Sequence, residues 1–203
     1  MDIVDIIIKK RKKVELTKEE LEYFVQSYVK NEITDYQAAA FIMAIAINGL
    51  TDKEIVNLTL AMANLGETVN DDFIRENVID KHSTGGVGDK VTLILMPLIA
   101  SVGVPVAKMS GRGLGVTGGT IDKLESIPGY NTRLSTHDFI NQVKEIGISL
   151  NGQSENFSPA DKKMYALRDV IGCTDSIPLI ASSIMSKKIA SRNIKNSSRC
   201  NLW

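Results

Sequence analysis

Two glycine-rich segments, each set between a strand-like run and a helix-like run, constrain the fold of this chain most. The first covers residues 81–90 (KHSTGGVGDK), after the short run 78–80 and before the apolar stretch 91–102. The second covers residues 108–120 (KMSGRGLGVTGGT) and overlaps the end of the strand-like run 104–109. A strand, a glycine turn and a helix in that order direct backbone N–H groups at an anion. We therefore expect parallel strands whose loops lie side by side at the carboxyl ends, where open α/β sheets bind ligands.

Each segment combines its glycines with a lysine and with hydroxyl side chains. Lys81 opens the first segment and Lys108 opens the second. The glycine spacing matches neither the Walker pattern nor G-x-G-x-x-G, so neither nucleotide fingerprint applies. A flexible, solvated loop explains the first segment alone equally well. Two lysines that converge at one edge of a sheet favour a free phosphate as the ligand.

The first third of the chain carries helix signals and no residues of evident chemistry. Three capping boxes mark helix starts, in which Thr17 pairs with Glu20, Thr34 with Gln37, and Thr51 with Glu54. The stretch 38–47 is apolar almost all round, which is typical of a central helix in a bundle. We expect residues 1–66 to form a helical domain with a structural role, and self-association is the alternative role.

The α/β part is expected to begin after a crossing segment. Residues 67–79 have mixed polar character, and the first strand is placed at Val78. Pro97 lies inside the apolar stretch that follows the first glycine loop, where a proline kinks a helix or shifts its start. A short helix is expected after Thr120.

A further helix and strand complete this part. Thr136 is a candidate N-cap, and Gly147 is placed to end the helix. Three apolar residues fall on one face of that helix: Phe139, Val143 and Ile146. Residues 148–150 form a plausible third strand.

Two more helices carry polar residues at helical spacing. Residues 158–161 (SPAD) form a strong helix start, with serine as N-cap, proline at N1 and an acid at N3. That helix carries Tyr165 and Arg168 three apart, and the next helix carries Ser183 and Lys187 four apart, so each pair shares a face. Taken alone, Arg168, Ser183 and Lys187 are more typical of a solvated surface.

Composition excludes several classes of function. Lysine plus arginine equals aspartate plus glutamate at 24 each, so charge gives no reason to expect nucleic acid or a membrane as partner. Cys173 and Cys200 form no metal spacing and no disulfide framework, which favours a cytoplasmic location. The N-terminus has the wrong order of charges for a secretory signal, and no apolar run reaches membrane-spanning length.

Four motifs resemble the thymidine and pyrimidine-nucleoside phosphorylase family. They are DKHSTGGVGD at 80–89, KMSGRGLGVTGGTIDKLES at 108–126, YALRD at 165–169 and SIPLIASSIMSKK at 176–188. The second motif departs from the family pattern at Val116, where that pattern has histidine. The resemblance runs from the N-terminus to about Ser191. Because chains of that family are longer, it implies a C-terminally truncated form.

The resemblance implies an α/β fold in two domains. One is an N-terminal helical bundle domain, residues 1–66, completed by helices within about 159–190, which supplies the contact of a homodimer. The other is an incomplete, mostly parallel α/β domain, residues 67–157, with glycine-rich phosphate loops. Residues 192–203 continue no family motif, and we expect them to form a free tail.

The implied reaction is phosphorolysis of a pyrimidine nucleoside to free base and pentose 1-phosphate. Phosphate is the nucleophile, so no protein nucleophile is required. The implied phosphate-binding residues are Lys81, His82, Ser83, Thr92, Lys108, Met109, Ser110 and Thr120, with His82 and Met109 acting through their backbone. Arg168, Ser183 and Lys187 would bind the base across a cleft, and Arg168 and Lys187 would be catalytic by stabilising the leaving group. A potassium ion would be held in part by the carbonyls of Gly88 and Lys90.

Other interpretations compete with this one. We expect the truncated form to have little or no activity, and a non-catalytic remnant that only self-associates is the first alternative. An enzyme like anthranilate phosphoribosyltransferase is the second, and the KMSGRG and SIPLI segments argue against it. Asp80, Asp89 and Glu125 are candidate counter-charges, with no sign of a paired acid and base.

Overall fold

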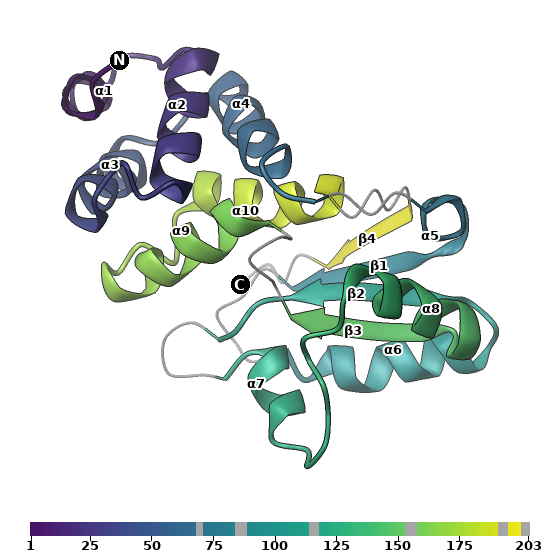
Figure 1. Ribbon diagram of the computed structural model, residues 1–203. Helices are drawn as coiled ribbons and strands as arrows, with labels where there is room; N and C mark the ends of the chain where they lie inside the picture. Colours follow the sequence, from purple (N-terminus) through teal and green to yellow (C-terminus); the bar gives the residue numbers. More distant parts are fainter. Residues whose placement is uncertain (68–70, 84–88, 114–117, 153–157, 191–194, 200–203) are drawn as a thin grey trace. The chain divides into compact units, whose positions relative to one another are not determined.

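The structure is a computed structural model that describes residues 1–67, 71–83, 89–113, 118–152, 158–190 and 195–199, without the side chains of 75, 83 and 195–199. The chain divides into two compact units (Figure 1). The helical unit comprises residues 1–67 and 155–190, and the α/β unit comprises residues 68–154 and 191–203. Each unit is considered by itself.

The helical unit joins helices from the two ends of the chain around one hydrophobic core. Its helices are α1 (Ile3–Arg11), α2 (Lys18–Val29), α3 (Asp35–Asn48), α4 (Asp52–Ala63), α9 (Pro159–Val170) and α10 (Ile177–Ala190). Phe24 packs on Tyr28 and Phe41, with ring centroids 5.8 and 4.2 Å apart. Met164 of α9 and Leu179 of α10 belong to the same core. The last two helices therefore complete the bundle that the first four begin.

Capping residues start the helices as the sequence predicts, with one partial exception. In α2 and α4, the threonine hydroxyl accepts from the backbone N–H of the N3 glutamate, whose carboxylate accepts from the threonine N–H. In α3 the Gln37 side chain accepts from the N–H of Thr34 at 3.1 Å and from its hydroxyl at 2.9 Å, and the threonine hydroxyl itself makes no cap bond. The three helix starts are confirmed.

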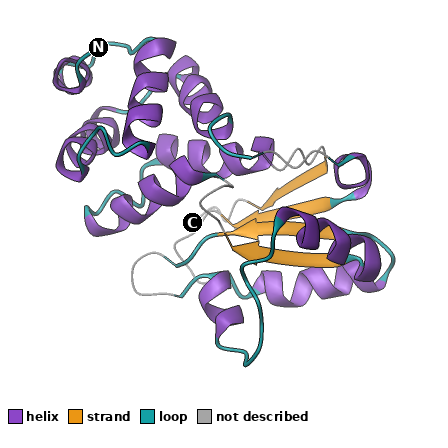
Figure 2. Ribbon diagram, viewed as in Figure 1, coloured by secondary structure: helices purple, strands orange, loops and turns teal. Residues whose placement is uncertain are grey.

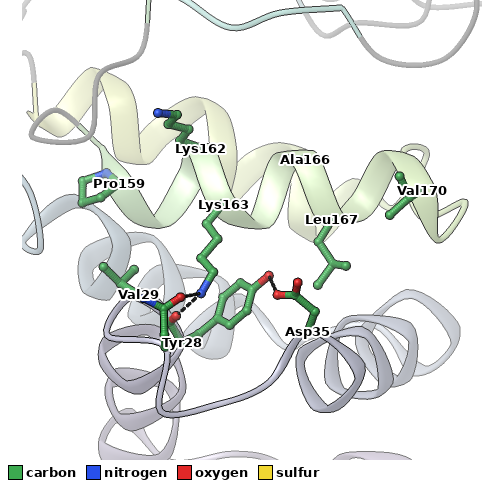
Figure 3. Close-up of a pocket in the computed structure, with 10 residues that line it drawn as sticks. Tyr28, Val29, Asp35, Pro159, Lys162, Lys163, Ala166, Leu167 and Val170 are labelled. Atoms are coloured by element: carbon green, nitrogen blue, oxygen red, sulfur yellow. Dashed lines mark hydrogen bonds between the residues drawn. The ribbon is translucent and has the colours of Figure 1, made fainter.

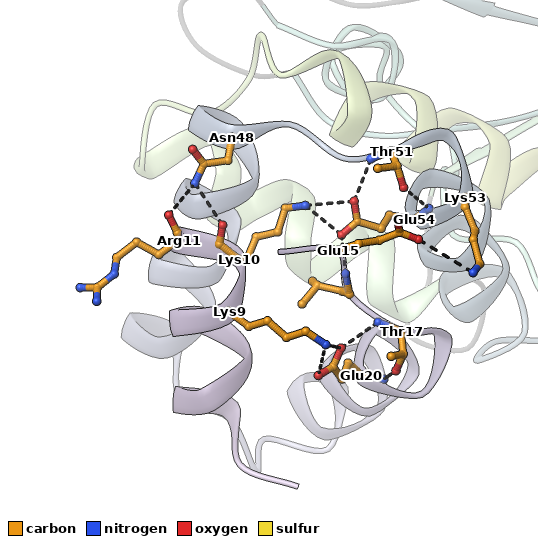
Figure 4. A network of polar contacts seen from close by, with 11 residues as sticks. Lys9, Lys10, Arg11, Glu15, Thr17, Glu20, Asn48, Thr51, Lys53 and Glu54 are labelled. Carbon is orange, nitrogen blue, oxygen red and sulfur yellow. Dashed lines mark hydrogen bonds and ion pairs between the residues drawn. The ribbon is translucent and has the colours of Figure 1, made fainter. Parts of the chain in front are cut away.

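A buried ion pair fastens α1 to α4 (Figure 4). The Lys10 ammonium group donates to both oxygens of Glu54 at 2.8 and 3.0 Å, and the backbone N–H of Leu16 donates to the same carboxylate at 2.9 Å. The Glu54 side chain has no exposed surface. Burial alone would raise the pKa of Glu54, but the hydrogen bonds from Lys10 and from the backbone of Thr51 and Leu16 hold it below its ordinary value.

The α/β unit contains a parallel sheet with helices against it (Figure 2). Its elements in chain order are α5 (Asp72–Asn77), β1 (Ile79–Ser83), α6 (Val91–Ser101), β2 (Val106–Ser110), α7 (Thr120–Glu125), α8 (Thr136–Ile146), β3 (Ile148–Gly152) and β4 (Lys195–Arg199). The strand order is β3-β2-β1-β4, and each neighbouring pair is parallel. A second core lies between α6, α7 and the sheet and includes Met96, Val106, Ile121, Leu124 and Leu150. The predicted α/β class is confirmed.

Some local predictions need correction or detail. The crossing segment includes the short helix α5, whose N-cap Asp71 accepts from the N–H of Ile74 at 3.2 Å. The first strand starts at Ile79, one residue after the expected Val78. The N-cap of α8 is Ser135, one residue before Thr136, and its hydroxyl accepts from the N–H of Asp138 at 3.1 Å. Phe139, Val143 and Ile146 all lie in α8 at the expected spacing, but only the first two are buried, and Ile146 is 58% exposed.

The proline and serine predictions are corrected in the same way. Pro97 lies inside α6, which starts at Val91, so the proline does not shift the start of that helix, and the expected kink stays a prediction. The helix α9 starts at Pro159 as predicted, but Ser158 makes no side-chain cap. Its φ of 57° lies in the left-handed region, whereas an N-cap residue typically has extended backbone angles.

The expected free tail is also wrong for residues 195–199. They form β4, which pairs with β1 from Ile79 opposite Lys195 to Ser83 opposite Arg199. Strand pairing uses main-chain groups, so it requires no apolar pattern in the sequence.

Within the parts of the chain that the structure describes, no helix combines the length and apolar character needed to cross a membrane.

Candidate anion-binding site

Neighbouring strands place the two predicted lysines beside each other. Ile79 of β1 pairs with Val106 of β2, and Lys81 and Lys108 each lie two residues further along their parallel strands. Both side chains are buried, with 7% of Lys81 and 1% of Lys108 exposed. Since alternate residues of a strand face the same side, the two lysines share a face of the sheet.

The two ammonium groups meet at one hydroxyl. Lys81 Nζ and Lys108 Nζ lie 3.3 and 3.2 Å from Thr92 Oγ1, and Lys108 Nζ also donates to the carbonyl of Lys81 at 2.7 Å. Thr92 lies in the first turn of α6 and has no exposed surface. The predicted convergence of the two lysines is confirmed.

A carboxylate that the sequence identified only as a candidate counter-charge is central to this cluster. Asp89 Oδ1 accepts from Lys81 Nζ at 2.6 Å, and Asp89 Oδ2 accepts from Thr92 Oγ1 at 2.5 Å and from Lys108 Nζ at 3.3 Å. The hydroxyl of Thr120 donates to the same Oδ2 at 3.3 Å. Burial alone would raise the pKa of Asp89, but the hydrogen bonds from Lys81 and Thr92 and the charges of both lysines hold it well below its ordinary value.

The remaining predicted phosphate residues lie in the same unit. Thr120 is the first residue of α7 and is 2% exposed. Met109 and Ser110 are buried at the end of β2, and His82 is partly buried in β1. Ser83 ends β1, but its side chain lies outside the described part of the structure, as does Val116. The binding roles of all these residues stay predictions.

The expected potassium ligands receive no test. Gly88 lies outside the described residues. Lys90 is the N-cap of α6 and is exposed. Within the described ranges, no group of three or more histidine, cysteine, aspartate or glutamate residues is placed to hold a metal ion. Backbone carbonyls are a different donor set, so the potassium site stays a prediction.

The second glycine segment is organised by Asp122. Its Oδ2 accepts from the N–H groups of Gly113 at 2.7 Å and Gly119 at 2.8 Å, which come from the two sides of the segment. Arg112 donates to Asp122 at 2.9 Å and forms a two-pronged pair with Glu125 at 2.8 and 2.9 Å. The predicted role of Glu125 as a counter-charge is thereby confirmed.

A second buried polar cluster lies in the helical unit. Lys187 Nζ of α10 donates to Asp161 Oδ2 of α9 at 2.5 Å and to Ser183 Oγ at 2.9 Å. Asp161, Ser183 and Lys187 are 1, 5 and 4% exposed. The solvated-surface interpretation is therefore wrong. The sequence showed Asp161 only as a helix-start acid, although a lysine on a largely buried helix needs an acid nearby.

Arg168 is buried and holds the turn between α9 and α10. Its Nε donates to the carbonyl of Cys173 at 3.0 Å, and its two terminal nitrogens donate to the carbonyls of Leu179 at 3.2 Å and Thr174 at 3.0 Å. Burial lowers the pKa of Arg168. A guanidinium group has five N–H donors, so these bonds leave donors for a ligand. The catalytic role of Arg168 stays a prediction.

A pocket of about 650 Å³ also lies in the helical unit (Figure 3). It is lined by residues of α2, the α2–α3 turn, α3 and α9: Tyr28, Val29, Asn31, Asp35, Pro159, Lys162, Lys163, Ala166, Leu167 and Val170. Lys163 Nζ donates to the carbonyl of Tyr28 at 2.5 Å and lies 3.9 Å from the centre of the Tyr28 ring. None of the predicted site residues lines this pocket.

A helical bundle joined to a parallel α/β unit defines the class of fold. The crystal structure of anthranilate phosphoribosyltransferase from Thermus thermophilus matches 98% of this chain and 57% of its own, with a TM-score of 0.70 and 19% sequence identity. At that identity the likeness shows the fold alone.

The chain belongs to the glycosyl transferase family. The family's model of the helical bundle domain matches residues 4–66, and its model of the a/b domain matches residues 75–197. The match extends beyond Ser191, where the motif resemblance was expected to end.

The chain is also similar in sequence to curated proteins of one kind. Pyrimidine-nucleoside phosphorylases of Staphylococcus epidermidis and Bacillus subtilis are 58% identical to this chain over 190 residues, and that of Geobacillus stearothermophilus is 56% identical. Each alignment covers 94% of this chain and 44% of the relative. The chain therefore spans less than half the length of these relatives.

Proposed function

We propose that this chain carries the phosphate-binding and base-binding groups for phosphorolysis of a pyrimidine nucleoside. The observation that carries the proposal is the meeting of Lys81 and Lys108 at Thr92 Oγ1. Relatives named pyrimidine-nucleoside phosphorylase, at 56 to 58% identity, support the choice of substrate. They also favour this reaction over the anthranilate phosphoribosyltransferase alternative, which has only a likeness of fold.

The reaction needs a positioned phosphate more than a protein nucleophile. The glycosidic bond breaks through a cation-like sugar, and a phosphate oxygen then bonds to the anomeric carbon as the bond to the base nitrogen breaks. Lys81, Lys108, Thr92 and Thr120 supply ammonium and hydroxyl donors from one buried cluster. Such charge-assisted hydrogen bonds are the strong ones for holding an oxyanion. Ser83, Ser110 and the backbone of His82 and Met109 complete the proposed phosphate set.

The departing base gains negative charge, which the helical unit is suited to stabilise. Lys187 carries a positive charge and lies 2.9 Å from the hydroxyl of Ser183, so both can donate to a pyrimidine edge. Arg168 adds unused guanidinium donors in the same unit. Stabilising charge that develops on a leaving group is an effective form of catalysis. A bound potassium ion would add a positive charge, and no step in this proposal passes through it.

We also propose that the chain forms a homodimer through α1 and α3. Four apolar residues on these packed helices are partly or largely exposed: Val4 at 46%, Ile8 at 37%, Met43 at 37% and Ile47 at 74%. We propose that these side chains form one apolar patch, which is typical of a protein–protein contact. Light scattering should give twice the monomer mass, and Ile47→Glu should give a monomer. A monomeric parent chain would contradict the dimer.

We also propose a cytoplasmic location, which suits the buried free thiol of Cys173.

The reaction is tested by incubating the 203-residue chain with uridine or thymidine, with and without phosphate. Phosphate-dependent release of free base supports phosphorolysis. Phosphate binding without release supports the proposed binding groups and the low activity expected of this form. A chain that neither binds phosphate nor releases base contradicts the proposal and favours the non-catalytic remnant that only self-associates.

A further inference from the structure

Asp89 is the common acceptor of four groups in the anion-binding site. It accepts from the ammonium groups of Lys81 and Lys108 and from the hydroxyls of Thr92 and Thr120, at 2.6, 3.3, 2.5 and 3.3 Å. The N–H of Thr92 also donates to it at 3.3 Å. These donors come from β1, β2, α6 and α7, so one carboxylate connects four elements of the α/β unit.

The carboxylate solves a physical problem of this cluster. Two buried ammonium groups that share a hydroxyl repel each other, and the repulsion is strong where water is excluded. A long lysine side chain also loses rotamer freedom when it is fixed in one place. A carboxylate beside both ammonium groups offsets the repulsion and fixes the direction of each. The donors are therefore gathered before any anion binds.

We propose that Asp89 is a positioning residue of the phosphate site, an inference that rests on the function proposed above. Its carboxylate holds Lys81, Lys108, Thr92 and Thr120 around one point in the phosphate-free protein. Phosphate then binds to donors that are already ordered, so binding does not bear the entropy cost of ordering them. Asp89 itself donates nothing to phosphate, and it acts only through its four partners.

A purely structural counter-charge is the competing explanation, and it makes a different prediction. Under that explanation, removing the carboxylate lowers the stability of the fold and leaves the affinity of the folded protein for phosphate unchanged. Under our proposal the affinity itself falls. The variant Asp89→Asn separates the two because it keeps the size of the side chain and removes its charge and one acceptor oxygen.

The matched control is Asp71→Asn in the same unit. Asp71 likewise accepts from a lysine, Lys144, at 2.7 Å and from a backbone N–H, that of Ile74, at 3.2 Å. Calorimetric titration with inorganic phosphate should show affinity about tenfold weaker in Asp89→Asn than in the parent chain, the effect expected for lost hydrogen bonds to charged groups. The affinity of Asp71→Asn should stay within about twofold. Equal affinity in Asp89→Asn and the parent chain overturns the proposal.

A second measurement needs no folded variant. In the phosphate-free parent chain, nitrogen-15 spectra should show ammonium signals of Lys81 and Lys108 protected by hydrogen bonding, and phosphate should shift both. Signals exposed to free exchange before phosphate is added overturn the positioning role. If the parent chain binds no phosphate at all, the proposed function fails. If the parent chain binds phosphate and Asp89→Asn binds it with the same affinity, only the role of Asp89 is rejected.

Discussion

Lys81 and Lys108 donate to opposite oxygens of one carboxylate, with Lys81 Nζ at 2.6 Å from Asp89 Oδ1 and Lys108 Nζ at 3.3 Å from Asp89 Oδ2. The lysines are 27 residues apart in sequence. Parallel pairing of β1 and β2 brings them together, and burial makes the shared acid necessary. The relationship links the topology of the sheet directly to the anion-binding role that we propose for it.

Gly119 should tolerate no side chain. A Cβ at this position would lie 2.3 Å from the backbone nitrogen of Gly113 and 2.5 Å from the carbonyl carbon of Arg112. Gly119→Ala should therefore lower the free energy of unfolding by about 1–3 kcal/mol and weaken phosphate binding, since Thr120 follows directly. Urea unfolding and phosphate titration measure the two effects.

Gly118→Ala provides the control for this prediction. Among the residues that the structure describes, its added Cβ would meet only the Cβ of Asp122, at an ordinary contact distance of 3.7 Å. Its stability and phosphate affinity should match those of the parent chain. If the two alanine variants behave alike, close backbone packing at Gly119 is not the cause.

Removing Lys187 should destabilise the helical unit through its partner. Lys187→Met leaves the Asp161 carboxylate buried without its ammonium donor, which should cost about 3–5 kcal/mol in the free energy of unfolding. The double variant Lys187→Met with Asp161→Leu should recover much of that loss, because neither charged group of this pair remains. Thermal unfolding of both variants and of Lys30→Met, an exposed lysine on the same unit, provides the comparison.

A double variant no more stable than Lys187→Met would contradict the assignment of the loss to an unpaired charge. The same double variant should also fail to bind pyrimidine base, since Lys187 is the proposed donor. Recovery of stability without recovery of base binding would separate the structural effect from the proposed function.

Glu54 should make the helical unit sensitive to acid. Its pKa is lowered in the folded protein, so the stability that it contributes is present above its unfolded pKa of about 4.5 and is lost as pH falls through the folded pKa. The difference in unfolding free energy between the parent chain and Glu54→Gln should be largest near pH 7, at about 3–5 kcal/mol, and should shrink below about pH 4.5. Urea unfolding at several pH values measures it. A difference that grows as pH falls would be contrary to this account.

Much of the fold could be predicted because its signals are local. Capping boxes at Thr17 and Thr51 and the left-handed Gly147, with φ of 76°, mark helix ends within a few residues. The strand β4 could not be predicted, because its pairing with β1 depends on main-chain bonds between distant segments. Ser158 failed as a cap because the sequence gives the residue type but not its backbone angle.

The site was predictable where its residues sit at the ends of strands and helices. Lys81 and Lys108 follow from the strand and loop pattern, and the pairing of Ser183 with Lys187 follows from helical spacing. The partners of these cations were harder to find. Asp161 lies 26 residues from Lys187, and only the packing of α9 on α10 brings the two together.

The central claim is that Lys81 and Lys108 form one site for inorganic phosphate. Calorimetric titration of the parent chain, Lys81→Met, Lys108→Met and the control Lys144→Met tests it most directly. Lys144 is a matched choice because it belongs to the same unit and pairs with Asp71 at 2.7 Å. We predict one phosphate bound by the parent chain and by Lys144→Met, with affinity at least about tenfold weaker in each of the other two variants. Equal phosphate affinity in all four proteins would contradict the account.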